Sequence, residues 1–184
     1  SLKATLNLPG RRLLRCWEIS VENRQTKESS LTFKQSKKMA SVSTYLNFPG
    51  KTEEAFEFYK SVFGGEYEGP VSRFRDIPPS PDMPPIPENI LDQVMHVCLP
   101  ITAGHKLMGT DAPEEMGFHL VMGNNIFLNL QPDTRAETQS LFKALSEGGV
   151  VQQELQDMFW GVYYGSCIDR YGIQWMFNCD EKKQ

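Results

Sequence analysis

The sequence lacks long hydrophobic runs and is poor in cysteine. No apolar stretch among its 184 residues approaches the roughly 20 residues that a membrane-spanning helix needs, so we do not expect a protein integrated in a membrane. The four cysteines, Cys16, Cys98, Cys167 and Cys179, form no C-x-x-C pair of the kind that binds zinc or exchanges disulfides. We therefore expect reduced, structural thiols and, since no secretory signal is visible, a cytoplasmic location.

Basic residues are scarce after residue 38. Residues 1–38 carry nine Lys and Arg against three Glu, whereas the rest of the chain carries ten against twenty Asp and Glu. Nucleic-acid binding needs clustered cations that replace phosphate counterions, so this acidic region predicts no nucleic-acid partner. We interpret 1–38 as a basic N-terminal extension: a flexible arm, a stretch upstream of a natural start at Met39, or an added edge strand. The domain proper is then 39–184.

A repeat runs through this domain. The strand pattern Tyr45–Phe48 is followed by Thr52, and the strand pattern Phe127–Leu130 is followed by Thr134 at the same distance. Each threonine begins an amphipathic helix pattern, and we expect each to cap its helix by accepting a hydrogen bond from a backbone N–H group. Both helix patterns end at a pair of glycines, where left-handed backbone is accessible.

Short strand patterns follow each helix. In the first copy they are Val94–Ile101 and Lys106–Thr110, and in the second they are Val150–Leu155, Trp160–Ile168 and Ile173–Phe177. The order predicts an α+β fold made of two tandem βαβββ modules, 41–111 and 118–180. The proline-rich segment Ile77–Pro87 is expected to be an exposed loop, because proline cannot join a central ladder.

The motifs of the two modules resemble those of a known family. They are Tyr45-Leu46-Asn47-Phe48, Glu54-Ala55, Phe58-Tyr59-Lys60 and Phe63-Gly64-Gly65-Glu66, then Met95-His96 and Leu107-Met108 before Asp111, and finally Glu147-Gly148-Gly149, Phe159-Trp160-Gly161, Gly165, Asp169-Arg170-Tyr171-Gly172 and Trp175-Met176. This set is similar to the PhnB-like branch of the vicinal oxygen chelate (glyoxalase/bleomycin-resistance/dioxygenase) superfamily. The resemblance implies curved mixed sheets around a small-molecule cavity, helices on the outer faces and, commonly, a homodimer.

Metal-dependent members of that superfamily bind the ion with His, Gln or Glu from the first and last strands of each module. The corresponding positions here are Tyr45, Met108, Phe127 and Met176, and a register slip of one residue supplies no convincing ligand either. Such a metal needs nitrogen or oxygen ligands that converge on an open position. We therefore predict no metal and no other cofactor.

Strand alternation separates the residues that face the helices from those that face the cavity. The residues expected to face the helices are Leu46, Phe48, Leu128, Leu130, Trp175 and Phe177. Apolar walls with a few amide groups suit a neutral organic ligand. The residues predicted to line the ligand cavity are Tyr45, Asn47, Met108, Phe127, Asn129, Gln174 and Met176.

His96 is the one candidate for catalysis. It lies in the middle of a predicted strand, where a histidine held by structural hydrogen bonds and a histidine used as a base both fit the pattern. None of the three histidines has an acidic partner at short spacing, so neither an HExxH motif nor a triad is present. Asp111 and Asp169 are interpreted as turn residues at strand ends.

Three functions are compatible with these patterns. The first is a metal-free protein of the bleomycin-resistance kind that binds a small organic ligand. The second is a lyase, isomerase or dioxygenase that acts on an unknown small substrate, with His96 as base or metal ligand. The third is a structural or interaction module whose cavity is filled by its own side chains. We also expect a homodimer, because two helices can cover only one face of each sheet and large apolar groups lie on both.

Overall fold

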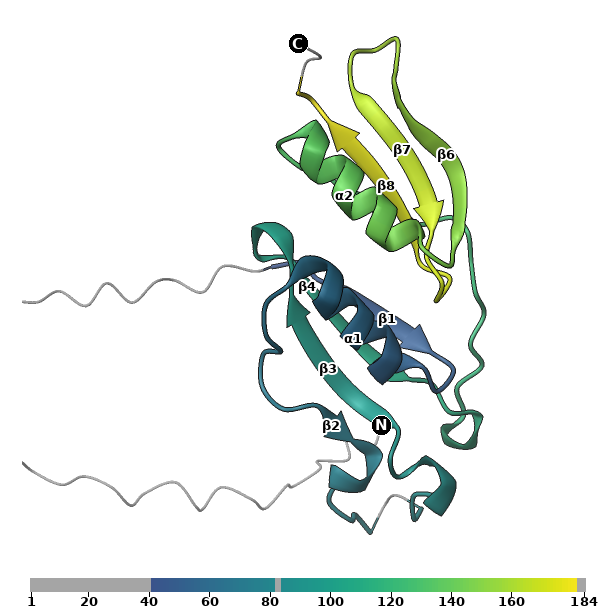
Figure 1. Cartoon of the computed structure of the whole chain (residues 1–184). Helices are drawn as coiled ribbons and strands as arrows, with labels where there is room; N and C mark the ends of the chain where they lie inside the picture. The colour runs from purple at the N-terminus through teal and green to yellow at the C-terminus, as the bar shows by residue number, and fades with distance from the viewer. Residues whose placement is uncertain (1–40, 82–83, 182–184) are drawn as a thin grey trace, which may run out of the picture. The chain divides into compact units, whose positions relative to one another are not determined.

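The computed structural model describes residues 41–81 and 84–181, which belong to one compact unit (Figure 1). The interpretation of residues 1–38 as an extension lies outside these ranges. Within them, no helix is long and apolar enough to cross a membrane.

Each module consists of one four-stranded sheet and one α-helix. Module 1 contains β1 (Thr44–Phe48), α1 (Thr52–Phe63), β2 (Ser72–Arg73), β3 (Val94–Pro100) and β4 (Lys106–Asp111). Module 2 contains β5 (Leu128–Leu130), α2 (Arg135–Ser146), β6 (Val150–Asp157), β7 (Tyr163–Ile168) and β8 (Gln174–Cys179). Short 3-10 turns lie at Phe74–Asp76, Glu88–Ile90, Thr102–Gly104 and Glu114–Met116.

The two sheets have the same topology. Their strand orders are β1-β4-β3-β2 and β5-β8-β7-β6. β1 runs parallel to its neighbour β4, and β5 runs parallel to its neighbour β8; all other neighbouring strands are antiparallel. The predicted α+β fold of two βαβββ modules is therefore confirmed.

Most strand boundaries lie within two residues of the prediction, and two strands differ more. β2 contains only Ser72 and Arg73, and its pairing with β3 is irregular, so the sequence offers no alternating pattern long enough to recognise. β7 begins at Tyr163 instead of Trp160. The preceding residues form a turn, in which the Met158 N–H donates to the Val162 carbonyl at 2.9 Å.

Alternation along the strands buries one face of each sheet against a helix. Phe48 of β1 meets Phe56 of α1 edge-on with ring centroids 6.5 Å apart, and Phe177 of β8 meets Phe142 of α2 at 5.4 Å. Of the residues that were expected to face the helices, five are buried and one, Leu128, is partly buried. The five are Leu46, Phe48, Leu130, Trp175 and Phe177.

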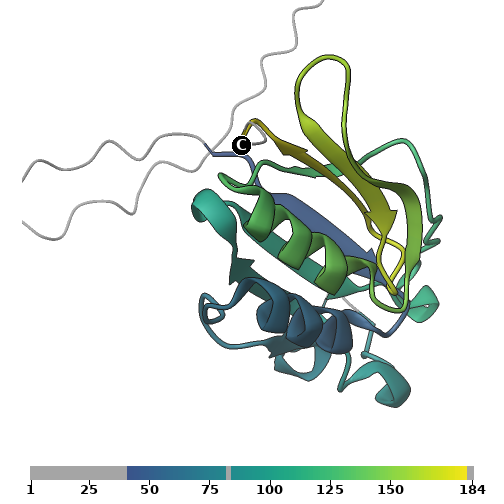
Figure 2. The ribbon, with the colours of Figure 1, turned by 45° about the horizontal axis from the view of Figure 1, so that its top comes forward.

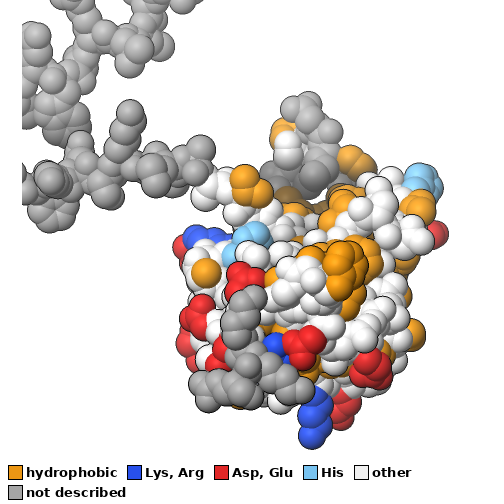
Figure 3. All heavy atoms as spheres, turned by 90° about the horizontal axis from the view of Figure 1, so that it is seen from above, with side chains coloured by type: hydrophobic (Ala, Val, Ile, Leu, Met, Phe, Trp, Pro, Cys, Tyr) orange, Lys and Arg blue, Asp and Glu red, His pale blue; other side chains and the backbone are white. Residues whose placement is uncertain are grey.

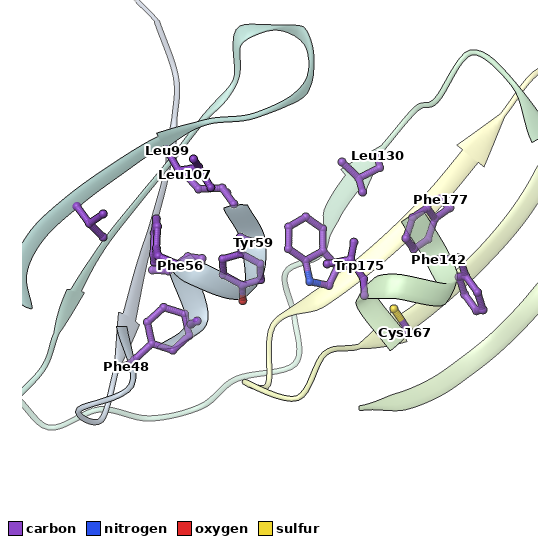
Figure 4. Packing of buried hydrophobic residues seen from close by; sticks show 14 of the residues in the cluster. Phe48, Phe56, Tyr59, Leu99, Leu107, Leu130, Phe142, Cys167, Trp175 and Phe177 are labelled. Atoms are coloured by element: carbon purple, nitrogen blue, oxygen red, sulfur yellow. The ribbon is translucent and has the colours of Figure 1, made fainter. Parts of the chain in front are cut away.

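The two modules share one hydrophobic core. Trp175 of β8 lies against Tyr59 of α1, with ring centroids 5.8 Å apart (Figure 4). Phe63 of the same helix contacts Trp175 as well, with ring centroids 5.7 Å apart. Because these contacts join the helix of module 1 to the sheet of module 2, the buried side chains form a single cluster.

Asp169 is the buried acceptor at this junction. Its carboxylate accepts four hydrogen bonds, from the Tyr59 hydroxyl and the Trp175 indole N–H (both 2.8 Å) and from the backbone N–H groups of Tyr171 and Ile173 (2.9 and 3.0 Å). Burial and the neighbouring Asp169 carboxylate together raise the pKa of Tyr59 far above its ordinary value, which keeps the hydroxyl a donor. The turn role predicted for Asp169 accounts for its two hydrogen bonds with backbone N–H groups, but not for those with Tyr59 and Trp175.

The two helices begin in different ways. Thr134 caps α2 as predicted, because the Glu137 N–H donates to Thr134 Oγ1 at 3.1 Å. The predicted threonine cap of α1 is wrong. Thr52 is the first residue of that helix, and its N–H and hydroxyl both donate to Asp111 Oδ1, at 3.0 and 2.7 Å. Asp111 also accepts from the Val94 N–H at 2.8 Å, so it is a buried cap from the end of β4 and not a turn residue.

Candidate functional site

The face of each sheet that points away from its helix is the candidate site. α1 packs on one face of the sheet of module 1 and α2 on one face of the sheet of module 2 (Figures 1 and 2), and among the described residues no α-helix covers the opposite faces. We call this the uncovered face. Strand pairing places on it the side chains of Tyr45, Asn47, His96, Cys98, Met108 and Thr110 in module 1, and of Asn129, Ser166, Gln174, Met176 and Asn178 in module 2.

Three predicted site residues lie together on module 1. Tyr45 of β1 is directly opposite Met108 of β4, and Asn47 is opposite Thr110 one step further along. Tyr45 is 47% exposed, and the burial of the rest of its side chain raises the pKa of its hydroxyl. This hydroxyl therefore stays protonated and can donate a hydrogen bond at neutral pH.

The pairing in module 2 is shifted by two residues relative to module 1. Met108 is opposite Tyr45, and the sequence pattern made Met176 the counterpart of Met108 opposite Phe127. In the structure Met176 is opposite Asn129 instead, and Phe127 lies just before β5. Because the shift is even, every side chain stays on its expected face.

The amide groups of module 2 are partly engaged with one another. Asn178 Nδ2 donates to Asn129 Oδ1 at 2.7 Å, and Gln174 Nε2 donates to the Ile126 carbonyl at 2.9 Å. Gln174 is only 6% exposed, and within the described residues its Oε1 atom has no hydrogen-bond partner. A buried acceptor in this state costs about 1–3 kcal/mol, so Gln174 is the group on this face with most to gain from a donor.

His96 lies on the uncovered face beside Tyr45. The Tyr45 hydroxyl and His96 Nδ1 are 3.3 Å apart, and the two rings lie within 28° of parallel with centroids 6.0 Å apart. Cys98 follows two residues later on the same face and donates to Glu68 Oε2 at 3.4 Å; burial raises the pKa of its thiol, which disfavours the thiolate. Sequence reasoning missed Cys98 as a member of this face, although its alternation with His96 was a usable signal.

A cavity of about 380 Å³ lies along β5, between the two modules. Thr44 and Leu107 line it from module 1, and Phe127 and Asn129 line it from module 2. Its volume falls within the range of about 300–1,000 Å³ that is typical of small-molecule sites. Two of the predicted ligand residues therefore border a space of suitable size.

The side chains at the superfamily's metal positions do not suit the metal. Tyr45, Met108, Phe127 and Met176 include no imidazole or carboxylate. Within residues 41–81 and 84–181, no group of three or more His, Cys, Asp or Glu side chains is arranged to hold an ion. Amide oxygens, the other donors on the uncovered face, are poor ligands for transition metals. The donor set therefore does not match a zinc, nickel or iron site.

Known proteins are similar to this chain in sequence and fold over most of the domain. The model of a family described as 3-demethylubiquinone-9 3-methyltransferase matches residues 40–177. The solved structure of protein PA1353 from Pseudomonas aeruginosa is 32% identical, with a TM-score of 0.66, and the match covers 79% of this chain and 100% of that one. Protein YjdN of Escherichia coli (strain K12) is 27% identical over 150 residues, which are 74% of this chain and 93% of that protein.

More distant structures agree in fold. A putative 3-demethylubiquinone-9 3-methyltransferase, PhnB protein, from Bacillus cereus is 23% identical, with a TM-score of 0.60 over 76% of this chain and 99% of that one. A structure from the glyoxalase/bleomycin resistance protein/dioxygenase family shares the fold at still lower identity. At these identities the likeness concerns architecture alone.

Proposed function

The chain belongs to the 3-demethylubiquinone-9 3-methyltransferase family, within the PhnB-like branch of the vicinal oxygen chelate superfamily, and from this premise we propose that it binds a small organic molecule without the superfamily's metal. The binding site would comprise the uncovered face and the adjoining cavity. Its residues in this proposal are Tyr45, Asn47, Met108, Phe127, Asn129, Gln174 and Met176.

The observation that carries this proposal is the cavity between the modules. Its lining is mainly apolar, from Ile101, Leu107, Phe127 and Leu128, with Asn129 among the polar residues. Such a lining desolvates an organic molecule while one amide fixes its orientation. A cavity of about 380 Å³ also speaks against a module filled entirely by its own side chains.

The absence of a metal in the proposal is supported by the donor set. A phenol, two thioethers and a phenyl ring at the four positions cannot supply the imidazole and carboxylate ligands of zinc, nickel or iron. We do not propose the methyltransferase activity that the family description names. A methyl donor bound through a nucleotide needs a glycine-rich turn between strand and helix. Of the two such turns, 49–51 and 131–134, only the first contains a glycine, Gly50.

An enzyme is the second candidate, and the place of His96 favours it. The imidazole lies on the uncovered face beside the Tyr45 hydroxyl and not in the core, so a base at this position would face the bound molecule. The metal-free binding protein is preferred, because among the residues that the structure describes His96 is bonded to a phenol and not to a carboxylate that would strengthen it as a base.

Metal content and ligand uptake test the proposal together. Protein purified without chelator should contain less than about 0.1 equivalent of Zn, Ni, Mn or Fe by plasma mass spectrometry. In saturation-transfer NMR, at least one of cyclohexanol and benzamide should bind, and Asn129→Trp, which fills the cavity, should abolish the signal. Gln152→Trp on the exposed strand β6 is the matched control and should bind as the wild type does.

Two results would contradict the proposal. One is a metal content near one equivalent that disappears in His96→Ala, which would show a recruited metal site. The other is saturation transfer that persists in Asn129→Trp, or that is absent for both compounds in the wild type.

A homodimer and a cytoplasmic location form part of the same proposal. Phe159 and Trp160, between β6 and β7, are 96% and 53% exposed, and Val150 of β6 is 60% exposed. In Figure 3, which views the molecule from above, hydrophobic side chains reach the surface near the middle of that face. A second copy would cover such groups. A mass by light scattering that stays monomeric across a tenfold range of concentration would reject the dimer.

The three cysteines among the described residues are free and buried, which fits a reducing compartment. Fractionation of cells that express a tagged chain tests the location. Recovery outside the cytoplasmic fraction would contradict it.

A further inference from the structure

The Tyr45 and His96 rings lie next to each other and nearly parallel on the uncovered face. Their planes are 28° from parallel and their centroids are 6.0 Å apart. Atoms of stacked rings touch at about 3.5–4 Å, so rings whose centroids are 6.0 Å apart are displaced sideways by more than they are separated in height. Most of each ring face is therefore left uncovered by the other ring. Tyr45 is accordingly 47% exposed.

Hydrogen bonding and packing hold the two rings in this arrangement. The Tyr45 hydroxyl and His96 Nδ1 lie 3.3 Å apart, which fixes one ring relative to the other. Met108 is directly opposite Tyr45 on the neighbouring strand β4, so its side chain is within reach of the Tyr45 ring on the same face. The surface is thus formed in advance of binding, and a ligand need not order it.

The surroundings of the rings carry polar groups but no free charge among the described residues. Asn47, two residues after Tyr45 on the same face, is exposed and offers both an amide donor and an acceptor. Lys106 is paired with Glu68, so its charge is neutralised locally. An anion or cation would find no partner here, whereas a neutral molecule with a hydroxyl or N–H group at its edge would.

We infer that Tyr45 and His96 are the stacking surface for a neutral, planar aromatic compound that carries a hydroxyl or N–H group at its edge. This inference rests on the proposed function and assigns a ligand class to one half of the site. A planar ring stacked on the exposed face of either side chain gains close dispersion contacts and a quadrupole interaction, whereas a saturated ring of the same size has no π quadrupole and makes fewer close contacts. Asn47 then bonds the edge group.

A pair of matched alcohols tests the inference. The probes are 2-naphthol, which is planar, and decahydro-2-naphthol, its saturated counterpart, each titrated into the full chain by isothermal calorimetry. We expect 2-naphthol to bind about tenfold more tightly than the saturated alcohol. Tyr45→Leu and His96→Leu should each reduce this preference to below about threefold. Tyr45→Phe, which keeps the ring, should retain it, and circular dichroism confirms the fold of each variant.

Phe118→Leu, which removes a partly exposed ring from the segment between the modules, is the control and should leave the preference unchanged. Equal affinity of the wild type for the two alcohols would overturn the inference and leave the proposed function intact. An undiminished preference in both leucine variants would overturn it as well. If neither alcohol binds, the inference falls, and the Asn129→Trp experiment decides separately on the proposed function.

Discussion

The two modules have the same topology, but different side chains cap the first turn of the helix in each. α2 begins with a local cap, in which Thr134 accepts from an N–H three residues later. α1 begins with a distant cap, in which Asp111 at the end of β4 accepts from the N–H and hydroxyl of Thr52. The local cap fixes only the helix, whereas the distant cap also fixes the helix to its sheet. A repeated fold therefore does not imply repeated interactions.

The helix-facing surfaces of the sheets differ in the same way. In module 1 the strand position opposite Leu46 is Gly109, and Phe56 of α1 fills the space above it. In module 2 the position opposite Leu128 is Trp175, which fills its own space and reaches α1. The bulky side chain is on the helix in one module and on the strand in the other. The space between sheet and helix is therefore filled in both modules, but by side chains from different elements.

Removal of the carboxylate shared by both modules should have the largest effect. Asp169→Ala leaves the buried Tyr59 hydroxyl and Trp175 N–H without this acceptor, and with them two partly buried backbone N–H groups. We expect the free energy of unfolding to fall by about 3–5 kcal/mol in urea titrations. The exposed Asp133→Ala should change it by less than about 0.5 kcal/mol. A loss below about 1 kcal/mol for Asp169→Ala would contradict the role assigned to this residue.

The two caps should differ in strength. Asp111→Ala removes the acceptor of three hydrogen bonds in a buried position, so we expect a loss of about 2–4 kcal/mol in the free energy of unfolding. Thr134→Ala removes a single exposed cap and should cost about 1 kcal/mol. Both are measured by the same urea titration. Equal losses for the two variants would show that the distant cap adds nothing to an ordinary one.

The space above Gly109 gives the smallest of the three effects. A Cβ atom there would lie 2.9 Å from Phe56 Cζ, so Gly109→Ala should cost about 1–3 kcal/mol through overpacking. Shortening the helix residue should relieve the clash: in a Phe56→Leu background the same substitution is expected to cost less than about 0.5 kcal/mol. Gly165→Ala in module 2 should cost less than Gly109→Ala, because the end of the flexible Leu155 side chain is its nearest neighbour. A double-mutant cycle with no coupling would refute this account.

The repeat was sufficient to predict the fold, because periodicity and spacing are local properties of the chain. The strand-to-helix segments beginning at Tyr45 and at Phe127 showed the period, and the alternation of Trp175 and Phe177 with their neighbours showed which side meets the helices. β2 was not predictable, since two residues carry no period. The Asp111 cap was missed for a different reason: its partner Thr52 is 59 residues away in sequence.

The sequence predicted which side of the sheets carries the candidate site residues, but not how those residues are arranged relative to one another. Alternation assigns Tyr45, Met108 and Gln174 to one side of the sheets, and that assignment survives any even shift of register. It does not determine which residues stand opposite one another, so the pairing of Met176 with Asn129 was missed. Nor does it reveal the Tyr45–His96 contact, which depends on rotamers of side chains on strands that are not adjacent.

The bond between Tyr59 and Asp169 also bears on how this domain can change over generations. The phenol comes from the first half of the gene and the carboxylate from the second, and each buried group has the other as a hydrogen-bond partner. The effect of a substitution at either position on stability therefore depends on a residue 110 positions away in the sequence. Recombination that exchanged one half for that of a relative would succeed only where the donor brought a matching partner. Two halves that look like copies are thus inherited as a single unit.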